Sequence, residues 1–332
     1  MGDIAVNLRE LFCEELLVLD GAVGTELERR GVSAPAPLWS AAALLSHPRL
    51  VREIHREYRA AGADIIVADT FRTNPRSLRA AKMLERGENL NRIAVELARA
   101  ARNQNHERRR ADNQADRVSS PCNTRARRPS RRINPAKYDT PTLQRPIVAA
   151  SAAPAEDCYS PELTPDEQIL LGEHREMMEW LHAAEPDLIW IETMGTIREA
   201  RAAARAAHDA RLPFAVSFML REDGGLLGGE SLSAAVEAVE PFAPLAVGLN
   251  CIPPDGITTH LPSLRRLTVR PLAAYAHINN VEPVPGWSFS QATTPTQYAE
   301  HAERWIDLGA TIVGGCCGTT PEHIRALRAA IR

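Results

Sequence analysis

Short apolar segments alternate with helical segments along most of the chain, and this alternation limits the fold more than any other feature. The apolar segments are rich in β-branched residues, while several helical segments begin after Ser, Thr or Pro and end near Gly or Pro. This pattern is typical of parallel strands connected by helices. The eight predicted strands are Leu16–Asp20, Asp64–Thr70, Pro146–Ser151, Asp187–Thr193, Phe214–Leu220, Leu245–Cys251, Pro271–His277 and Ala310–Gly315. The predicted helices include Pro48–Ala61, Pro165–Ala184, Thr196–Ala210, Ser231–Val239, Thr294–Leu308 and Pro321–Ile331.

Eight strand–helix units in a chain of 332 residues predict one (β/α)8 TIM barrel domain that spans residues 1–332. An open, doubly wound sheet is the alternative, and it fits this number of units less well. The hydrophobic fraction of 44% is sufficient for a large core. Because the active sites of such barrels lie at the carboxyl ends of the strands, we expect reactive side chains there.

One segment, residues 103–145, interrupts the pattern before the third predicted strand. It contains the arginine-rich runs Arg108–Arg110 and Arg127–Arg132 and almost no apolar residues. Such a composition cannot bury enough apolar surface to become ordered, so we expect a disordered low-complexity insertion. A solvated loop and a binding site for an anionic partner such as RNA are the two interpretations of its charge.

The overall charge and the cysteine content limit the partners and the compartment. A net charge of −3 gives no general attraction to nucleic acid or to an anionic membrane. Met1–Glu15 lacks the pattern of a signal peptide, and the chain has no apolar run of about 18 residues that could span a bilayer. Six cysteines are too sparse for a disulfide scaffold in a chain of this length. We therefore expect a soluble, cytoplasmic protein with reduced thiols and no membrane partner.

Polar residues lie at the ends of several predicted strands, as the barrel requires of an active-site face. Asp20, Thr70, Glu192 and Asn250 each occupy such a position. Any one of them is equally typical of a helix cap or a solvated loop. The convergence of all of them on one face of the barrel favours a functional site.

Three cysteines also lie at strand ends. Cys316 and Cys317 follow the last predicted strand, and Cys251 ends another. Adjacent cysteines rarely form a disulfide with each other without strain, so the pair is better suited to two thiolates that bind one metal. With Cys251 this makes three thiolates, a number typical of a catalytic zinc site with an open fourth position. The alternative is a buried core cysteine and an incidental pair.

These residues also carry a family resemblance. Leu19–Thr25, Ile191–Met194, Gly248–Cys251 and Gly314–Ile324 together resemble the homocysteine S-methyltransferase family. That family includes S-methylmethionine-dependent and betaine-dependent enzymes and the homocysteine module of cobalamin-dependent methionine synthase. The resemblance extends from about Leu16 to Ile331, except for the insertion.

The resemblance implies a function in methionine biosynthesis, namely transfer of a methyl group to homocysteine to give methionine. It implies that Cys251, Cys316 and Cys317 hold Zn²⁺ and that the homocysteine thiolate is the fourth ligand and the nucleophile. Asp20 and Glu192 would bind the amino group, and backbone amides of residues 21–24 would bind the carboxylate. The substrate contacts implied in this way are Asp20, Gly21, Thr25, Thr70, Glu192 and Asn250.

The chain departs from the family pattern after the seventh predicted strand, where the run Tyr275–Asn280 replaces a short turn with Asn and Gly. Handling of the methyl donor is therefore expected to differ. His277 is either a neighbour of the metal or the donor, or a strand-end histidine satisfied by hydrogen bonds. Phe71 and Trp287 are either packing residues or cation–π partners of a sulfonium group.

Several alternatives stay open. S-methylmethionine or S-adenosylmethionine suits a chain without a cobalamin or folate domain, and a corrinoid protein acting in trans is another source of methyl groups. The acceptor is either homocysteine or another thiol or selenol, such as selenocysteine.

Schiff-base aldolase chemistry requires a strand-end lysine, whereas the two lysines, Lys82 and Lys137, lie in a predicted helix and in the insertion. An RNA-binding protein acting through the insertion would be non-enzymatic, but the chain lacks interleaved aromatics and a basic fold surface. The sequence does not determine the oligomeric state.

Overall fold

The computed structural model describes residues 2–103, 143, 145–278 and 293–331. Its strands form one sheet in which all neighbouring strands are parallel, in the order β1-β8-β7-β6-β5-β4-β3-β2. Leu19 forms a parallel bridge with Ile65, and the Asp20 backbone N–H donates to the Ile65 carbonyl at 3.0 Å, which closes β1 onto β2. The predicted TIM barrel is therefore confirmed. The strands are β1 (Leu17–Val18), β2 (Ile65–Ala68), β3 (Ile147–Ala152), β4 (Leu188–Met194), β5 (Phe214–Phe218), β6 (Val247–Asn250), β7 (Leu272–Ala276) and β8 (Ala310–Gly315).

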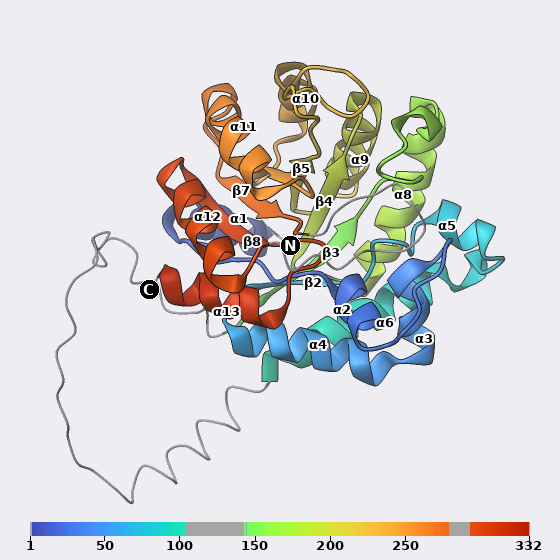
Figure 1. Cartoon of the computed structure of the whole chain (residues 1–332). Helices are drawn as coiled ribbons and strands as arrows, with labels where there is room; N and C mark the ends of the chain where they lie inside the picture. The colour runs from blue at the N-terminus through green and yellow to red at the C-terminus, as the bar shows by residue number, and fades with distance from the viewer. Residues whose placement is uncertain (1, 104–142, 144, 279–292, 332) are drawn as a thin grey trace, which may run out of the picture.

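Helices surround the barrel, as Figure 1 shows. The predicted helices are confirmed with small differences at their ends. One example is α8, which begins at Glu167 because Asp166, in an extended conformation, is its N-cap. The helices are α1 (Gly2–Glu14), α2 (Val23–Arg29), α3 (Ala43–Ser46), α4 (Pro48–Ala61), α5 (Pro75–Ala80), α6 (Gly87–Arg99), α8 (Glu167–Ala184), α9 (Ile197–Asp209), α10 (Leu232–Val239), α11 (Pro254–Leu267), α12 (Pro295–Asp307) and α13 (Pro321–Ala330).

Two layers of apolar side chains make up most of the core. The larger cluster joins the helices to the outer faces of the strands, and the smaller one includes Trp190, Tyr275 and Ile312 of the strands together with Phe12 of α1. The Thr311 hydroxyl donates to the Phe12 carbonyl at 3.1 Å, which fastens α1 to β8. Because one face of each strand packs against helices and the other packs inside the barrel, few polar side chains are tolerated except at the strand ends.

A buried ion pair links the start of β2 to the last helix. Asp64 accepts hydrogen bonds from the backbone N–H of Val18 at 3.0 Å and of Leu143 at 2.8 Å. Its carboxylate also pairs with the guanidinium of Arg328 in α13, and both side chains are almost fully buried. Asp64 therefore joins β1, β2 and α13 where the barrel closes.

The predicted insertion lies almost entirely outside the described residues, so its predicted disorder stays a prediction. Of the segment 103–145, the structure describes Asn103, Leu143 and Arg145. Within the described part of the chain, no helix is both long and apolar enough to cross a membrane.

The Asp64 pair leads to a stability prediction. Asp64→Asn removes the charge that compensates buried Arg328, and loss of one partner of a buried pair costs about 3–5 kcal/mol. We expect the free energy of unfolding, measured by urea denaturation, to fall by that amount. Glu85→Gln is the matched control, because Glu85 is exposed and the substitution removes the same charge. Equal stability of the two variants would contradict the role given to Asp64.

Candidate active site

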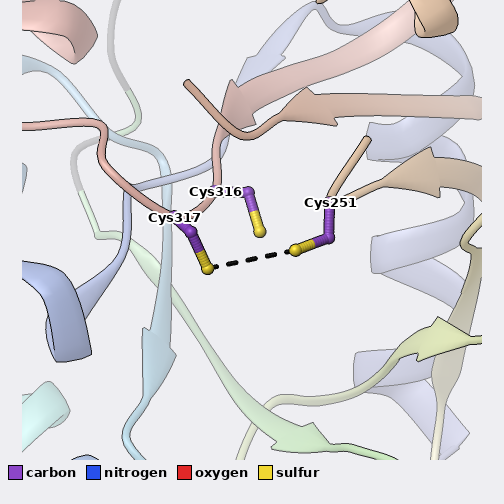
Figure 2. Close-up of side chains that lie close together, drawn as sticks. All are labelled: Cys251, Cys316 and Cys317. Atoms are coloured by element: carbon purple, nitrogen blue, oxygen red, sulfur yellow. Dashed lines mark hydrogen bonds between the residues drawn. The ribbon is translucent and has the colours of Figure 1, made fainter. Parts of the chain in front are cut away.

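Three cysteines meet at the carboxyl ends of β6 and β8. Cys251 directly follows β6, and Cys316 and Cys317 directly follow β8. Their sulfur atoms all lie within 4.8 Å of one another, and the Cys251 and Cys317 Sγ atoms are 3.9 Å apart (Figure 2). Tetrahedral zinc with Zn–S bonds of about 2.3 Å places two sulfur ligands about 3.8 Å apart. The spacing of the three sulfur atoms therefore fits a tetrahedral metal ion such as zinc.

Strand β7, which lies between β6 and β8, holds the cysteine loops in place. The Cys251 backbone N–H donates to the Tyr275 carbonyl at 3.2 Å, and the Cys316 N–H donates to the Ala276 carbonyl at 3.0 Å. Cys251 has a positive φ of 53°, a conformation that is strained for a side chain of this kind and that turns the chain sharply after β6. The thiols are therefore held in position by backbone hydrogen bonds from one shared neighbour.

A glycine is required immediately before the cysteine pair. A Cβ on Gly315 would lie 2.2 Å from the Thr319 Oγ1. That hydroxyl donates to the Cys316 carbonyl at 2.7 Å and so closes the turn that carries both cysteines. The double-glycine motif of the sequence therefore has a steric cause at this position.

The clustered thiols favour a cation. Hydrogen bonding to the Cys316 thiol and burial raise the pKa of the Cys251 thiol well above its ordinary value. Ionisation of all three thiols concentrates negative charge in a buried space, which a divalent metal offsets. The chemistry of the donor set thus agrees with its geometry.

Two predicted substrate contacts, Asp20 and Glu192, line the same cavity as the cysteines, which has a volume of about 140 Å³. The Asp20 Oδ2 accepts a hydrogen bond from the Val67 N–H at 3.0 Å, and the Glu192 Oε1 accepts one from the Ser151 hydroxyl at 2.5 Å. Burial raises the pKa of Asp20 well above its ordinary value and that of Glu192 to about 7. Both carboxylates would be stabilised by a ligand that brings a positive charge.

The cavity is acidic. Besides Asp20 and Glu192 it is lined by Glu28 and Asp69, whereas none of its described lining residues is a lysine, an arginine or a histidine. Its charged side chains therefore favour cationic ligands over anionic ones.

Gly21 and Thr25 also line the cavity and join the first and last strand ends. The Thr25 Oγ1 accepts a hydrogen bond from the Gly318 N–H at 3.0 Å. A Cβ on Gly21 would lie 2.8 Å from the Tyr58 hydroxyl oxygen, so only glycine permits this close approach. These residues place the backbone of the first turn beside the cysteine loop.

Thr70 and Asn250 are not among the residues that line the cavity. The Thr70 hydroxyl donates to the Ser151 carbonyl at 2.7 Å and links β2 to β3. The Asn250 Oδ1 accepts a hydrogen bond from the N–H of Thr193, which has a positive φ of 58°. Both are fully buried, so the structure gives them a part in holding strand ends.

His277 lies outside the cavity as well, and burial lowers its pKa to about 4, which leaves the ring neutral at pH 7. A hydrogen bond with the Cys251 backbone opposes this lowering of the pKa, whereas the His277 Nδ1 has no hydrogen-bond partner among the described residues, so the histidine is satisfied only in part. Phe71 lines the cavity and stacks on Trp39, with ring centroids 5.9 Å apart. Trp287 lies outside the described residues.

Tyr159 and Asp69 line the cavity but were not predicted as site residues. The Tyr159 hydroxyl lies 3.3 Å from the Cys251 Sγ, within hydrogen-bonding distance of a candidate metal ligand. Tyr159 belongs to the loop after β3, where no motif distinguishes it. Asp69, by contrast, follows a predicted strand core as Asp20 does, and that signal was present in the sequence.

The raised pKa of Glu192 leads to a prediction for the substrate-free, metal-free protein. The carboxyl binds its proton more tightly when folded, so its stabilising contribution is complete below about pH 4.5 and is lost as the pH rises through about 7. Glu192→Gln should therefore gain stability relative to wild type by up to about 3 kcal/mol between pH 4.5 and 8. Urea unfolding at several pH values measures this difference, with Glu85→Gln as control. Parallel pH profiles for wild type and Glu192→Gln would contradict the prediction.

The chain is similar to known proteins over most of its length. The family model of homocysteine S-methyltransferase matches residues 17–331. Homocysteine S-methyltransferase 3 from Zea mays is 30% identical over 328 residues, which cover 94% of this chain and 88% of that protein. A selenocysteine methyltransferase from Astragalus bisulcatus is 28% identical over 325 residues, which cover 93% of this chain and 90% of that protein.

A solved structure is similar to this chain over nearly the whole length of both. The metallated form of the homocysteine methyltransferase MmuM from Escherichia coli matches with a TM-score of 0.74 and 30% sequence identity, covering 97% of this chain and 99% of that one. The fold, the sequence match and the three convergent cysteines lead to one conclusion: this chain belongs to the homocysteine S-methyltransferase family and is a methyltransferase.

Proposed function

We propose that this enzyme transfers a methyl group to the thiol of homocysteine to give methionine, with Zn²⁺ held by Cys251, Cys316 and Cys317. One observation carries the proposal: three thiols and two carboxylates with raised pKa values line one cavity. Homocysteine offers the complementary groups, a thiol and an ammonium. Zinc binding needs reduced thiols, so we also propose a reducing, cytoplasmic location.

The metal and the protein side chains have separate tasks in this proposal. A bound zinc ion supplies a Lewis acid that favours the deprotonated form of a thiol at neutral pH. Asp20 and Glu192 orient the substrate ammonium, which lowers the pKa of both carboxyls and recovers the cost of their burial. The backbone of residues 21–24 lines the cavity and offers N–H groups to the substrate carboxylate.

The charge of the cavity favours a cationic methyl donor. When a thiolate attacks a sulfonium methyl group, a new S–C bond forms, and the electron pair of the broken bond goes to the donor sulfur, which becomes a neutral thioether. S-methylmethionine and S-adenosylmethionine are donors of this kind. The four acidic residues that line the cavity attract a cation, whereas they would repel a polyanionic donor such as a folate.

A selenol acceptor is the second candidate. It is favoured by the 28% identity with a selenocysteine methyltransferase over 93% of this chain. The ratio of kcat/KM for homocysteine and selenocysteine, measured with the same donor, distinguishes the two acceptors.

The central experiment incubates the purified enzyme with homocysteine and, separately, with S-methylmethionine, S-adenosylmethionine and a methylated corrinoid protein. Methionine is then measured by mass spectrometry. Formation of methionine with a sulfonium donor is the expected result. Absence of methionine with every donor would overturn the proposed reaction.

The three cysteines lead to a prediction on metal content. Cys251→Ser, Cys316→Ser and Cys317→Ser should each reduce bound zinc from one ion per chain to a small fraction, because each removes one of three thiolates. Elemental analysis after dialysis measures the loss. Cys13→Ser is the matched control, since Cys13 is a free, exposed cysteine on α1. Full zinc occupancy in the Cys316→Ser protein would contradict the assignment.

The two carboxylates lead to a prediction on substrate binding. Asp20→Asn and Glu192→Gln should each weaken homocysteine binding by about 2–5 kcal/mol, the cost of breaking a buried, hydrogen-bonded charge pair. Bound zinc should stay at the wild-type level, because neither side chain is a member of the thiol cluster. Calorimetric titration and elemental analysis measure the two quantities. Unchanged affinity in both variants would exclude the carboxylates from the substrate site.

A further inference from the structure

Asp69 is an acidic residue of the cavity that has one carboxylate oxygen without a hydrogen-bond partner among the described residues. It directly follows β2, lines the same cavity as the cysteines and is only 6% exposed. Its Oδ1 accepts a hydrogen bond from the Ser40 hydroxyl at 2.6 Å, but its Oδ2 is buried and has no partner among the described residues. A buried carboxylate oxygen without a donor costs free energy, so this arrangement favours a ligand that supplies one.

The surroundings of Asp69 suit the body of a small organic cation. Trp39, which precedes Ser40, and Phe71, which lies two positions after Asp69, both line the cavity, and their rings are nearly parallel, at an angle of 12°. The neighbouring cation, Arg72, lies over the Trp39 ring at 4.1 Å and donates to the Glu156 carbonyl at 2.8 Å. Arg72 forms no ion pair with Asp69 in the described structure, so the carboxylate stays uncompensated.

Asp69 is also distinct from the two carboxylates assigned to homocysteine. The Asp20 carboxylate accepts a hydrogen bond from the Val67 N–H of β2, and the Glu192 carboxylate accepts one from the Ser151 hydroxyl of β3. Asp69 is held instead by Ser40, which belongs to the short 3₁₀ helix Trp39–Ala42 that follows α2. The cavity therefore has a carboxylate left over after the homocysteine ammonium is bound.

We propose that Asp69 binds the α-ammonium group of the methyl donor and selects sulfonium donors that are amino acids; this inference rests on the proposed function. The ammonium donates a charge-assisted hydrogen bond to the Asp69 Oδ2. Trp39 and Phe71 cover the apolar chain between the ammonium and the sulfonium. In the transfer, the methyl–sulfur bond of the donor breaks and its sulfur becomes neutral, while the ammonium keeps its proton and its contact with Asp69. Asp69 therefore acts on donor binding and takes no part in the breaking or forming of bonds.

A comparison of two donors tests this role. S-methylmethionine carries a sulfonium, a carboxylate and an α-ammonium, whereas dimethylsulfoniopropionate carries only the first two. Asp69→Asn should raise the donor KM for S-methylmethionine about 10- to 100-fold, the usual effect of losing a hydrogen bond to a charged group, with little change in kcat. The KM of dimethylsulfoniopropionate, or its inhibition constant where it is not turned over, should change less than about twofold because it has no ammonium to lose.

Two further variants sharpen the comparison. Ser40→Ala keeps the Asp69 charge but removes its hydrogen bond, so it should raise the same KM by a smaller factor than Asp69→Asn. Glu85→Gln removes an exposed negative charge and should leave both donors unaffected. Asparagine has nearly the shape of aspartate, and equal thermal midpoints of the wild type and Asp69→Asn would show that the fold is intact.

The outcomes distinguish failure of the role given to Asp69 from failure of the proposed methyl transfer. An equal rise for both donors, or no rise for S-methylmethionine, would overturn the role of Asp69 while leaving the methyl transfer in place. Absence of methionine formation by the wild type with every donor would instead overturn the proposed function itself. A selective rise for S-methylmethionine alone supports the assignment.

Discussion

The backbone hydrogen bonds that β7 makes with the loops on both sides hold the candidate metal site together. The Tyr275 and Ala276 carbonyls accept hydrogen bonds from the N–H groups of Cys251 and Cys316. The cysteines that follow β6 and β8 are therefore both anchored to β7. A change in the register of β7 would move the two loops relative to each other and separate the thiols. The metal site therefore depends on closure of the barrel, which in turn depends on contacts such as Asp64 with β1 and α13.

The buried acids of the cavity show how binding and stability oppose each other. Asp20, Glu192 and Asp69 all have raised pKa values because burial disfavours their charged forms. In the free enzyme they lower the stability at neutral pH, whereas a ligand ammonium restores it. An acidic cavity with thiols at one part of its wall and an aromatic pair at another suits two amino-acid substrates that each carry a positive charge.

Much of the fold could be predicted because strand and helix patterns are local. Pro48–Ala61 and Ala310–Gly315 were predicted with the bounds that the structure has, since capping signals and β-branched runs mark their ends. The side-chain directions at strand ends were harder to predict. Thr70 was predicted as a substrate contact, yet its hydroxyl bonds to Ser151, while the neighbouring Asp69 lines the cavity. Successive side chains of an extended chain point to opposite sides, so a choice between adjacent residues requires the register.

By itself the sequence determined the barrel class, the family and the three cysteines, because eight repeated units and a double-glycine, double-cysteine motif are local signals that need no knowledge of distant contacts. The tertiary structure alone decided which polar groups share a cavity. Tyr159 approaches Cys251 from a loop 92 positions earlier in the chain, and Ser40 bonds to Asp69 across 29 positions. Such contacts arise from closure of the sheet and the packing of loops over its rim, and their long sequence separation leaves no periodic pattern from which they could be predicted.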